Sequence, residues 1–175
     1  MGYILQKHYA LESGSVLVNG NTPLEDIKTA SWRKKTGVVT QAPALFNGSL
    51  IENITLGRAT HPEEIEKFVK NYGFDRYFLK FPGGYATPLG EEGINISGGQ
   101  IQLVAFARAL FEKPQLLILD EFSSAMDLEM ENFVLELLNK IKNKTLILLI
   151  THKKEQLKRV ADKFFEFTPS TGSVY

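Results

Sequence analysis

Apolar residues in the middle of the chain recur with the spacing of a helix that buries one face. The spacing i, i+3, i+4 and i+7 places four apolar residues on one side: Ile65, Phe68, Val69 and Tyr72. Thr60 and Glu63 have the spacing of a capping box at the start of this helix. Gly73 follows the last apolar residue and supplies a stop signal. The pattern therefore predicts an amphipathic helix between Thr60 and Gly73.

Further helical patterns follow along the chain. Asp75 is a candidate cap for a short aromatic helix over residues 76–81. A glycine-rich stretch over 90–99 leads into a helix with four apolar residues on one face: Val104, Ala107, Leu110 and Phe111. Pro114 prevents that helix from continuing. Asp127 is expected to cap a last helix, whose apolar stripe consists of Met130, Val134, Leu137 and Ile141.

Four short segments have the composition of β-strands. Residues 116–119 are consecutive large aliphatics without alternation, which predicts a central parallel strand buried on both faces. Residues 145–150 form a second apolar strand, and residues 15–18 and 37–40 are β-branched between turn formers. Strands alternating with helices predict an α/β fold with a parallel sheet covered on both faces. Residues 41–99 break this rhythm, being helical without a convincing strand, and are interpreted as a helical insertion.

Composition narrows the class of protein. In 175 residues, 20 Lys and Arg balance 20 Asp and Glu, which argues against a nucleic-acid partner or an electrostatic membrane anchor. The chain has no cysteine, which excludes disulfide scaffolds and thiolate metal sites. No apolar run approaches the roughly 18 residues of a membrane helix, and residues 1–7 lack the pattern of a signal peptide. A cytoplasmic location is therefore expected.

Polar side chains follow three of the predicted strands: Gln41, the pair Asp120 and Glu121, and His152. Parallel α/β sheets bind ligands at the carboxyl edge, where such residues meet. An acidic pair there suits a magnesium ion and a base, with Asp120 holding the metal through its water shell and Glu121 activating water. Each feature also has a structural explanation: a solvated strand end for the acidic pair, and a hydrogen-bonded structural histidine for His152. Gln41 alone is almost uninformative.

Residues 96–100, Ile-Ser-Gly-Gly-Gln, lie where a loop becomes a helix. The glycines let backbone N–H groups approach an anion, Ser97 adds a hydroxyl donor, and the helix dipole adds positive potential. This pattern predicts a phosphate-binding helix start without a lysine. The alternative is a glycine-rich helix cap that binds no ligand. The acidic pair that begins 20 residues further along disfavours this alternative.

These motifs, in this order from about Ser13 to Lys163, resemble the nucleotide-binding domain of ATP-binding-cassette (ABC) transporters. The correspondence consists of Gln41 with the Q-loop, residues 96–100 with the signature motif, residues 116–121 with the Walker B strand, residues 124–127 with the D-loop and His152 with the switch histidine. Residues 48–54 and 88–93 are similar to segments of exporters. The resemblance implies a P-loop NTPase (RecA-like) sheet with a helical subdomain insertion.

The resemblance also implies a role for each matching residue. Glu121 would be the general base, Asp120 and Gln41 would serve the magnesium ion, and His152 would contact the γ-phosphate of ATP. The signature residues Ser97, Gly98, Gly99 and Gln100 would bind ATP held by a second nucleotide-binding domain, in a head-to-tail dimer with Asp127 at its seam. The implied divisions are 1–40 and 105–175 for the α/β core and 41–104 for the helical subdomain. Transmembrane domains of an exporter are the other implied partners, at the inner face of the membrane.

The sequence departs from that family at one essential point. No glycine among the 14 begins a Gly-x-x-x-x-Gly-Lys-Ser/Thr motif, so the phosphate-cradling P-loop is absent from these 175 residues. Family order places that loop and its strand before residue 1, since residues 3–9 resemble the tail of the P-loop helix. The chain alone is therefore expected to bind ATP and Mg²⁺ weakly and to hydrolyse ATP negligibly. Self-association through an uncovered sheet edge is a second expectation.

Two other functions remain alternatives. One is half of a chromosome-maintenance or DNA-repair ATPase head, although no heptad-repeat segment separates Gln41 from Ser97 and the net charge of zero does not favour DNA. The other is a degenerate, non-catalytic cassette that serves as an interaction module. Intact Asp120, Glu121 and His152 argue against the second alternative, because a silent site needs no base.

Overall fold

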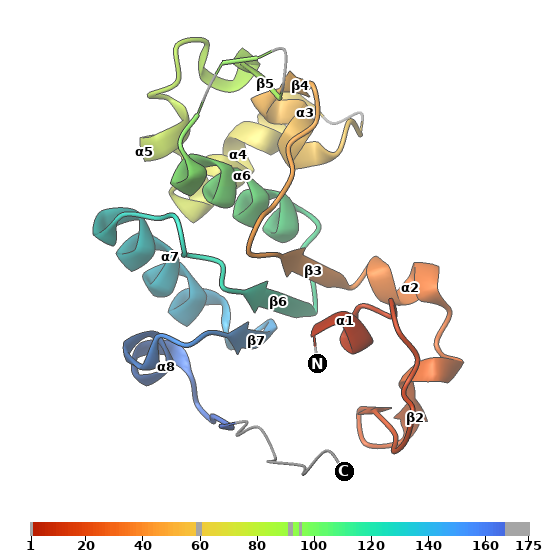
Figure 1. The fold of residues 1–175 in the computed structure, drawn as a ribbon. Helices are drawn as coiled ribbons and strands as arrows, with labels where there is room; N and C mark the ends of the chain where they lie inside the picture. The colour runs from red at the N-terminus through yellow and green to blue at the C-terminus, as the bar shows by residue number, and fades with distance from the viewer. Residues whose placement is uncertain (1, 59–60, 91–92, 95, 167–175) are drawn as a thin grey trace, which may run out of the picture.

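A parallel sheet of three strands forms the centre of the computed structural model, which describes residues 2–58, 61–90, 93–94 and 96–166. The strands β3 (Thr36–Val39), β6 (Leu116–Asp120) and β7 (Leu146–Ile150) lie in the order β3-β6-β7. Val39 pairs with Leu119, which pairs with Leu149 on the other side. The crossovers between these parallel strands run through helices, as the alternation of patterns predicts (Figure 1).

One face of this sheet carries the core of the molecule. Helices α6 (Gly98–Phe111) and α7 (Leu128–Ile141) lie over it (Figure 1). Leu117 and Leu119 of β6 are fully buried in the same apolar cluster as the inward residues of both helices. The expected central position and burial of β6 are confirmed, because its four aliphatic residues are all buried.

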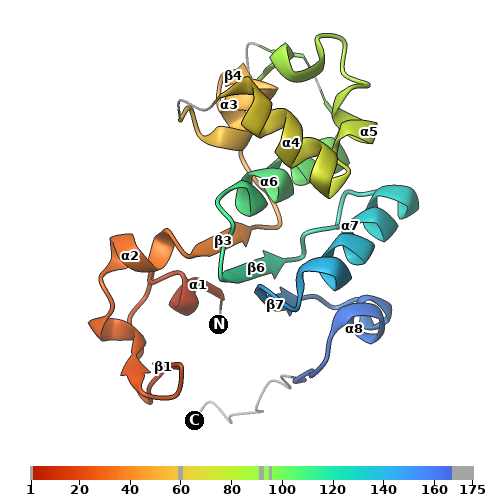
Figure 2. The same ribbon diagram turned by 180° about the vertical axis from the view of Figure 1, so that it is seen from behind.

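The opposite face of the sheet is covered less completely. Figure 2 shows the short helix α1 (Gly2–Leu5) on the side away from α6. A Cβ built on Gly2 would lie 3.3 Å from Cδ1 of Ile150, so α1 touches the end of β7. The expected coverage of the sheet is incomplete at the start of β7, where Leu146 is 71% exposed. The reason is its place at one end of the three-stranded sheet.

Residues 41–97 form a second layer above α6, built mainly from helices. They comprise β4 (Gly48–Ser49), α3 (Leu50–Thr55), α4 (Pro62–Tyr72), α5 (Asp75–Phe78), the 3-10 turn Gly84–Ala86 and β5 (Pro88–Leu89). An aromatic cluster joins this layer to α6 and α7: Phe74 packs against Phe78, Phe106 and Phe133, with ring centroids 5.5–6.2 Å apart. The predicted helical insertion therefore shares one core with the sheet.

Three local predictions differ from the structure. Helix α4 begins at Pro62 with His61 as its cap, rather than at Thr60, because proline fits the first helical position. Thr60 itself lies outside the described residues. Asp75 is the first residue of α5 rather than its cap, and that helix ends at Phe78. The two-residue strands β4 and β5 pair antiparallel within a segment expected to lack strands.

The segment before β3 has little regular structure. It contains the hairpin β1 (Leu17–Val18) and β2 (Thr22–Pro23), the 3-10 turn Leu24–Asp26 and helix α2 (Thr29–Arg33). Side chains fix it to backbone carbonyls: Trp32 Nε1 donates to Leu5, and Lys7 Nζ donates to Leu24 at 2.9 Å. No helix in the part of the chain that the structure describes could span a membrane.

Candidate functional site

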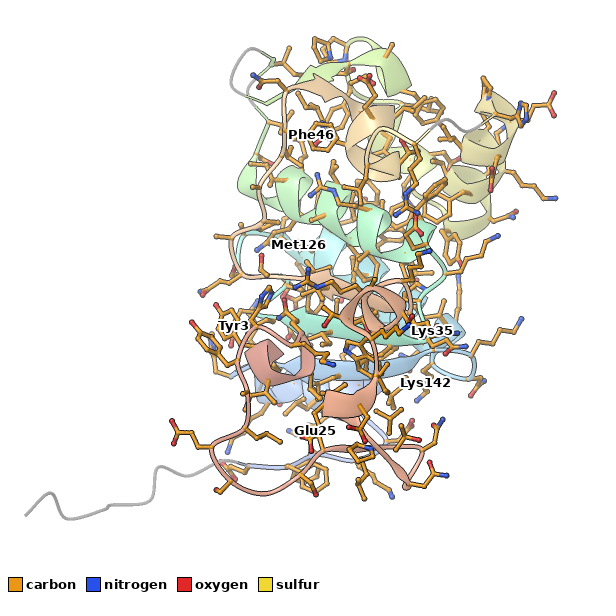
Figure 3. The ribbon with its side chains drawn as sticks, turned by 90° about the vertical axis from the view of Figure 1, so that its right-hand side faces the viewer. Tyr3, Glu25, Lys35, Phe46, Met126 and Lys142 are labelled. Atoms are coloured by element: carbon orange, nitrogen blue, oxygen red, sulfur yellow. The ribbon has the colours of Figure 1, made fainter. Side chains whose placement is uncertain are left out.

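The carboxyl ends of the three parallel strands lie at one edge of the sheet, and the polar residues predicted to act there follow them. Figure 3 shows Met126 at the end of the molecule opposite to Lys35 and Lys142, which precede β3 and β7. Glu121 and His152 therefore emerge together beyond β6 and β7.

Glu121 and His152 form direct contacts with each other. Oε1 of Glu121 lies 2.9 Å from His152 Nδ1 and accepts a hydrogen bond from the His152 backbone N–H at 3.0 Å. Glu121 is only 19% exposed, whereas the His152 side chain is 79% exposed. A carboxylate at Nδ1 orients the imidazole and directs Nε2 outwards. The pair can thus hold a proton and present a ring nitrogen to a bound anion.

The backbone of Glu121 is in an uncommon conformation. Its φ of 48° lies in the left-handed region, which non-glycine residues adopt at a cost of about 1–3 kcal/mol. The N–H of Glu121 donates to the carbonyl of Ile150 at 2.9 Å, which holds this turn at the end of β6. The turn aims the carboxylate across the sheet edge at His152 instead of continuing the strand.

Asp120 and Gln41 supply oxygen ligands of the kind that magnesium prefers. Asp120 ends β6 and is half-buried, and Gln41 is exposed two residues after β3. Among residues 2–58, 61–90, 93–94 and 96–166, no group of three acidic, histidine or cysteine side chains could enclose a metal ion. One carboxylate and one amide oxygen fit a magnesium ion that keeps most of its waters and binds substrate phosphates.

The start of α6 has two backbone donors without a hydrogen-bond partner among the residues that the structure describes. Ser97 caps the helix in a capping box: its Oγ accepts from the Gln100 N–H at 3.2 Å, and Gln100 Oε1 accepts from the Ser97 N–H at 2.8 Å. These bonds satisfy two of the four N–H groups that a helix start cannot pair internally. The N–H groups of Gly98 and Gly99 are the other two, and Ser97 retains its hydroxyl proton. This arrangement suits an anion at the helix start.

The two glycines also have a packing role that the sequence did not reveal. A Cβ on Gly99 would lie 2.8 Å from the carbonyl oxygen of Ala125, and one on Gly98 would lie 2.9 Å from the Ala125 Cβ. The helix start is thus in close contact with the turn over 124–126. Asp127 follows this turn and caps α7, with Oδ1 accepting from the Met130 N–H at 2.8 Å, as predicted.

Gln102 connects the parts of the site and was missed in the sequence. Its Nε2 donates to the carbonyl of Gln41 at 3.2 Å and to Ser124 Oγ at 2.8 Å, while Oε1 accepts from the Ala125 N–H at 3.0 Å. Gln102 is 2% exposed, and it interrupts an otherwise apolar run in the first half of α6. A polar residue in such a run is the signal that could have identified it.

Arg108, one and a half turns further along α6, fixes the other end of the Gln41 segment. Its guanidinium donates to the carbonyls of Asn53 at 2.7 Å and Ala44 at 2.9 Å. Asn53 is fully buried and in turn bonds both backbone groups of Phe46. Burial lowers the pKa of Arg108 from its usual value. Helix α6 therefore carries the Gln41 loop at both ends.

The exporter-like segment over 88–93 is only partly described. Pro88 and Leu89 form β5, and Gly90 has a φ of 95° that suits glycine. A Cβ on Gly90 would clash with Asn47, whose Cα would lie 2.8 Å away, so this turn packs tightly against the loop before β4. Glu91 and Glu92, the acidic residues of this segment, lie outside the described residues.

Comparisons with known proteins agree with this arrangement. The family model described as ABC transporter matches residues 3–124. The chain is 34% identical over 158 residues to ABC transporter B family member 13 of Arabidopsis thaliana, covering 90% of this chain and 13% of that protein. It is 35% identical over 151 residues to YgaD of Bacillus subtilis (strain 168), provisionally named a multidrug export ATP-binding/permease protein, covering 86% and 26%.

A solved structure shows the same fold. The structure of a bacterial Atm1-family ABC exporter with ATP bound superposes with a TM-score of 0.80 at 29% identity, covering 89% of this chain and 28% of that one. The chain thus spans about a quarter or less of the length of these relatives. The family model matches more than half of the chain's residues, and the solved exporter has the same fold. The chain therefore belongs to the ABC transporter family and is part of an exporter-type ATP-binding domain.

Proposed function

We propose that this chain supplies the signature motif and the water-activating residues for ATP hydrolysis in an ABC exporter. The contact between Glu121 and His152 at the carboxyl edge of the sheet is the observation that carries this proposal. A base beside an exposed imidazole, next to Asp120, is an arrangement suited to phosphoryl transfer to water. The exporter relatives favour export as the process that this hydrolysis drives.

Glu121 acts as the general base in this proposal. Both contacts with His152 are made by Oε1, so Oε2 is the oxygen that takes the proton from the attacking water. His152 Nε2 faces outwards; because Nδ1 carries the proton shared with Glu121, Nε2 donates to the γ-phosphate from the doubly protonated imidazolium form. Gln41 orients the water. The hydrogen bond from the Gln102 side chain to the Gln41 carbonyl sets the position of Gln41 relative to Glu121.

Asp120 and Gln41 would hold the magnesium ion, Asp120 through the metal's water shell. A magnesium ion held there would supply positive charge to the substrate's phosphates. Ser97, Gly98 and Gly99 donate to the γ-phosphate of ATP carried by a second nucleotide-binding domain, and Gln100 keeps the Ser97 backbone in the capped conformation. Asp127 lies at the seam of that head-to-tail dimer, which works at the inner face of the membrane with transmembrane partners.

Binding of ATP by the chain alone should be weak, because these 175 residues contain no P-loop motif. Each missing charge-assisted hydrogen bond to the phosphates removes about 1.5–3 kcal/mol. Isothermal titration of the chain with Mg-ATP should give a dissociation constant of roughly 1 mM or weaker. Micromolar binding would contradict this part of the proposal.

A complementation assay tests the proposed role of the signature residues. The ATP-binding domain of YgaD, with its own signature serine replaced, is mixed with this chain, which then supplies Ser97 to the ATP held by the YgaD domain. We expect the chain to restore ATP turnover, Ser97→Ala to abolish this effect, and Ser13→Ala, at an exposed serine of the N-terminal segment, to leave it unchanged. Equal turnover with and without the chain would count against the proposed site.

A further inference from the structure

The loop that carries His152 is held by side chains for which the site described above has no role. Thr151 Oγ1 donates to Gln156 Oε1 at 3.0 Å and accepts from the Lys153 backbone N–H at 3.0 Å. Lys153 Nζ donates to Glu131 Oε2 on α7 at 2.8 Å. Both neighbours of His152 are therefore anchored, one to α8 (Lys154–Val160) and one to α7.

A buried pair of polar residues links these anchors to the strand that ends in Glu121. Gln156 and Ser123 are each 2% exposed, and Gln156 Nε2 donates to Ser123 Oγ at 2.6 Å. Ser123 Oγ donates in turn to Glu131 Oε2 at 3.1 Å. Ser123 lies two residues after Glu121, so the network joins the ends of β6 and β7. Buried polar networks of this kind define one geometry when all members are paired.

The ion pair between Glu131 and Lys153 is the charged part of this network. Its side chains are 16% and 35% exposed, against 80% and 70% for Glu155 and Lys158, an ion pair of the same residue types on α8. Partial burial opposes ionisation of Glu131, but hydrogen bonds from Lys153, Gln156 and Ser123, together with the charge of Lys153, outweigh burial and lower the pKa of Glu131. Coulomb attraction is stronger at such a site than between exposed groups.

Helix α8 does not depend on this ion pair for its attachment to α7. At its far end, Asn139 Nδ2 donates to the carbonyl of Arg159 at 3.0 Å, and Lys142 Nζ donates to that of Val160 at 3.3 Å. Val160 is also buried in the apolar core. Loss of the Lys153 contact should therefore release the loop over 151–153 while α8 stays in place.

We propose that Lys153 and Glu131 are positioning residues that hold His152 against Glu121. Lys153 follows His152 directly in the sequence, and its side chain bonds to Glu131 on α7. This anchor fixes the direction in which the His152 side chain projects from the loop. The consequence for hydrolysis rests on the proposed function, but the geometry does not. When the ion pair is removed, His152 Nδ1 loses its fixed contact with the Glu121 carboxylate.

Nitrogen-15 NMR of the full 175-residue chain tests this geometry through the tautomer of His152. Spectra are recorded at about pH 8, at which free imidazole is neutral. A contact between Nδ1 and a carboxylate requires the proton on Nδ1, whereas the exposed His8 and His61 average between both tautomers and serve as internal references. We expect the Nδ1–H signature for His152 in the parent chain and averaged resonances, like those of His8, in Lys153→Met.

Three further variants complete the test. Lys153→Arg should retain the Nδ1–H signature, because arginine reaches the same carboxylate, and Lys158→Met should retain it because that ion pair is exposed. Glu131→Gln, which keeps an acceptor, should shift His152 part of the way and serves if Lys153→Met does not fold. An unchanged His152 spectrum in folded Lys153→Met or Glu131→Gln, or an equal change in Lys158→Met, would overturn the proposal. The NMR experiment contains no ATP. Its outcome therefore does not depend on whether the complementation assay succeeds or fails.

Discussion

The two faces of the central sheet differ sharply in how they are packed. On the face towards α6 and α7, Val39, Leu117 and Leu119 are at most 1% exposed. On the other side, Ile118 of the central strand is also buried, but Leu146 of β7 is 71% exposed; in the N-terminal hairpin, outside this sheet, Leu17 is 51% exposed. The packed face carries the signature helix and the bonds of Gln102, whereas the open face carries none of the predicted site residues. Apolar packing therefore supports the helix that carries the proposed signature residues.

The largest expected difference is in the free energy of unfolding, between a substitution at a leucine of the packed region and one at a leucine of the open region. Leu103→Ala on α6 removes a side chain that is fully buried and should reduce the free energy of unfolding by about 2–5 kcal/mol. Leu17→Ala makes the same chemical change in β1 and should cost less than about 0.5 kcal/mol. Urea unfolding of both variants measures the difference. Similar losses would show that the N-terminal segment is packed as tightly as α6.

A smaller effect is expected from the polar link on the packed side. Gln102→Met keeps the approximate volume but leaves the carbonyl of Gln41 and the N–H of Ala125 without their partner, at a cost of about 1–3 kcal/mol. Gln115→Met, at an exposed position just before β6, should change stability by less than about 0.5 kcal/mol.

Hydrogen exchange gives this comparison a local readout. The Ala125 amide should exchange faster in Gln102→Met and unchanged in Gln115→Met. An Ala125 amide that is equally protected in both variants would show that Gln102 does not hold the turn over 124–126.

A substitution in β7, at the open end of the sheet, should have the smallest effect on stability. It should nevertheless measurably reduce self-association. Leu146→Thr retains a strand-forming residue and removes exposed apolar surface from β7, so stability should change by less than about 0.5 kcal/mol. Light scattering should report less self-association than in the parent chain. Leu128→Thr, at an equally exposed leucine on α7, is the control and should not alter association. A parent chain that stays monomeric at high concentration would remove the basis for this comparison.

Patterns that depend on long apolar runs predicted the fold well. The four aliphatic residues of β6 indicated a central strand, and the stripe from Met130 to Ile141 indicated α7 with Asp127 as its cap. Short elements escaped because two residues, as in β4 and β5, give no period. Helix α8 was not predicted, since its buried residues are only Gln156 and Val160. The exposure of Leu146 at the start of β7 was not predicted, because composition does not specify a strand's place in a sheet.

Motif order predicted which site residues belong together, but not what holds them. Gln41, Asp120, Glu121 and His152 could be selected from their places after strands. Gln102 contacts a residue that is 61 positions away in the sequence, and Arg108 contacts one that is 64 positions away. No local pattern encodes such contacts. The glycines of the signature were interpreted as space for an anion, and their tight fit against Ala125 depends on a turn distant in sequence.

The left-handed backbone of Glu121 affects how inactive versions of this domain should be made. Glutamine at this position keeps the same unfavourable dihedral angles, so a Glu121→Gln chain remains a faithful thermal reference for the parent. Glycine relieves the conformational energy, which favours a higher melting temperature, but it also removes the carboxylate that contacts His152. A heat-resistant homologue with glycine here would thus combine a relaxed backbone with the loss of the proposed base.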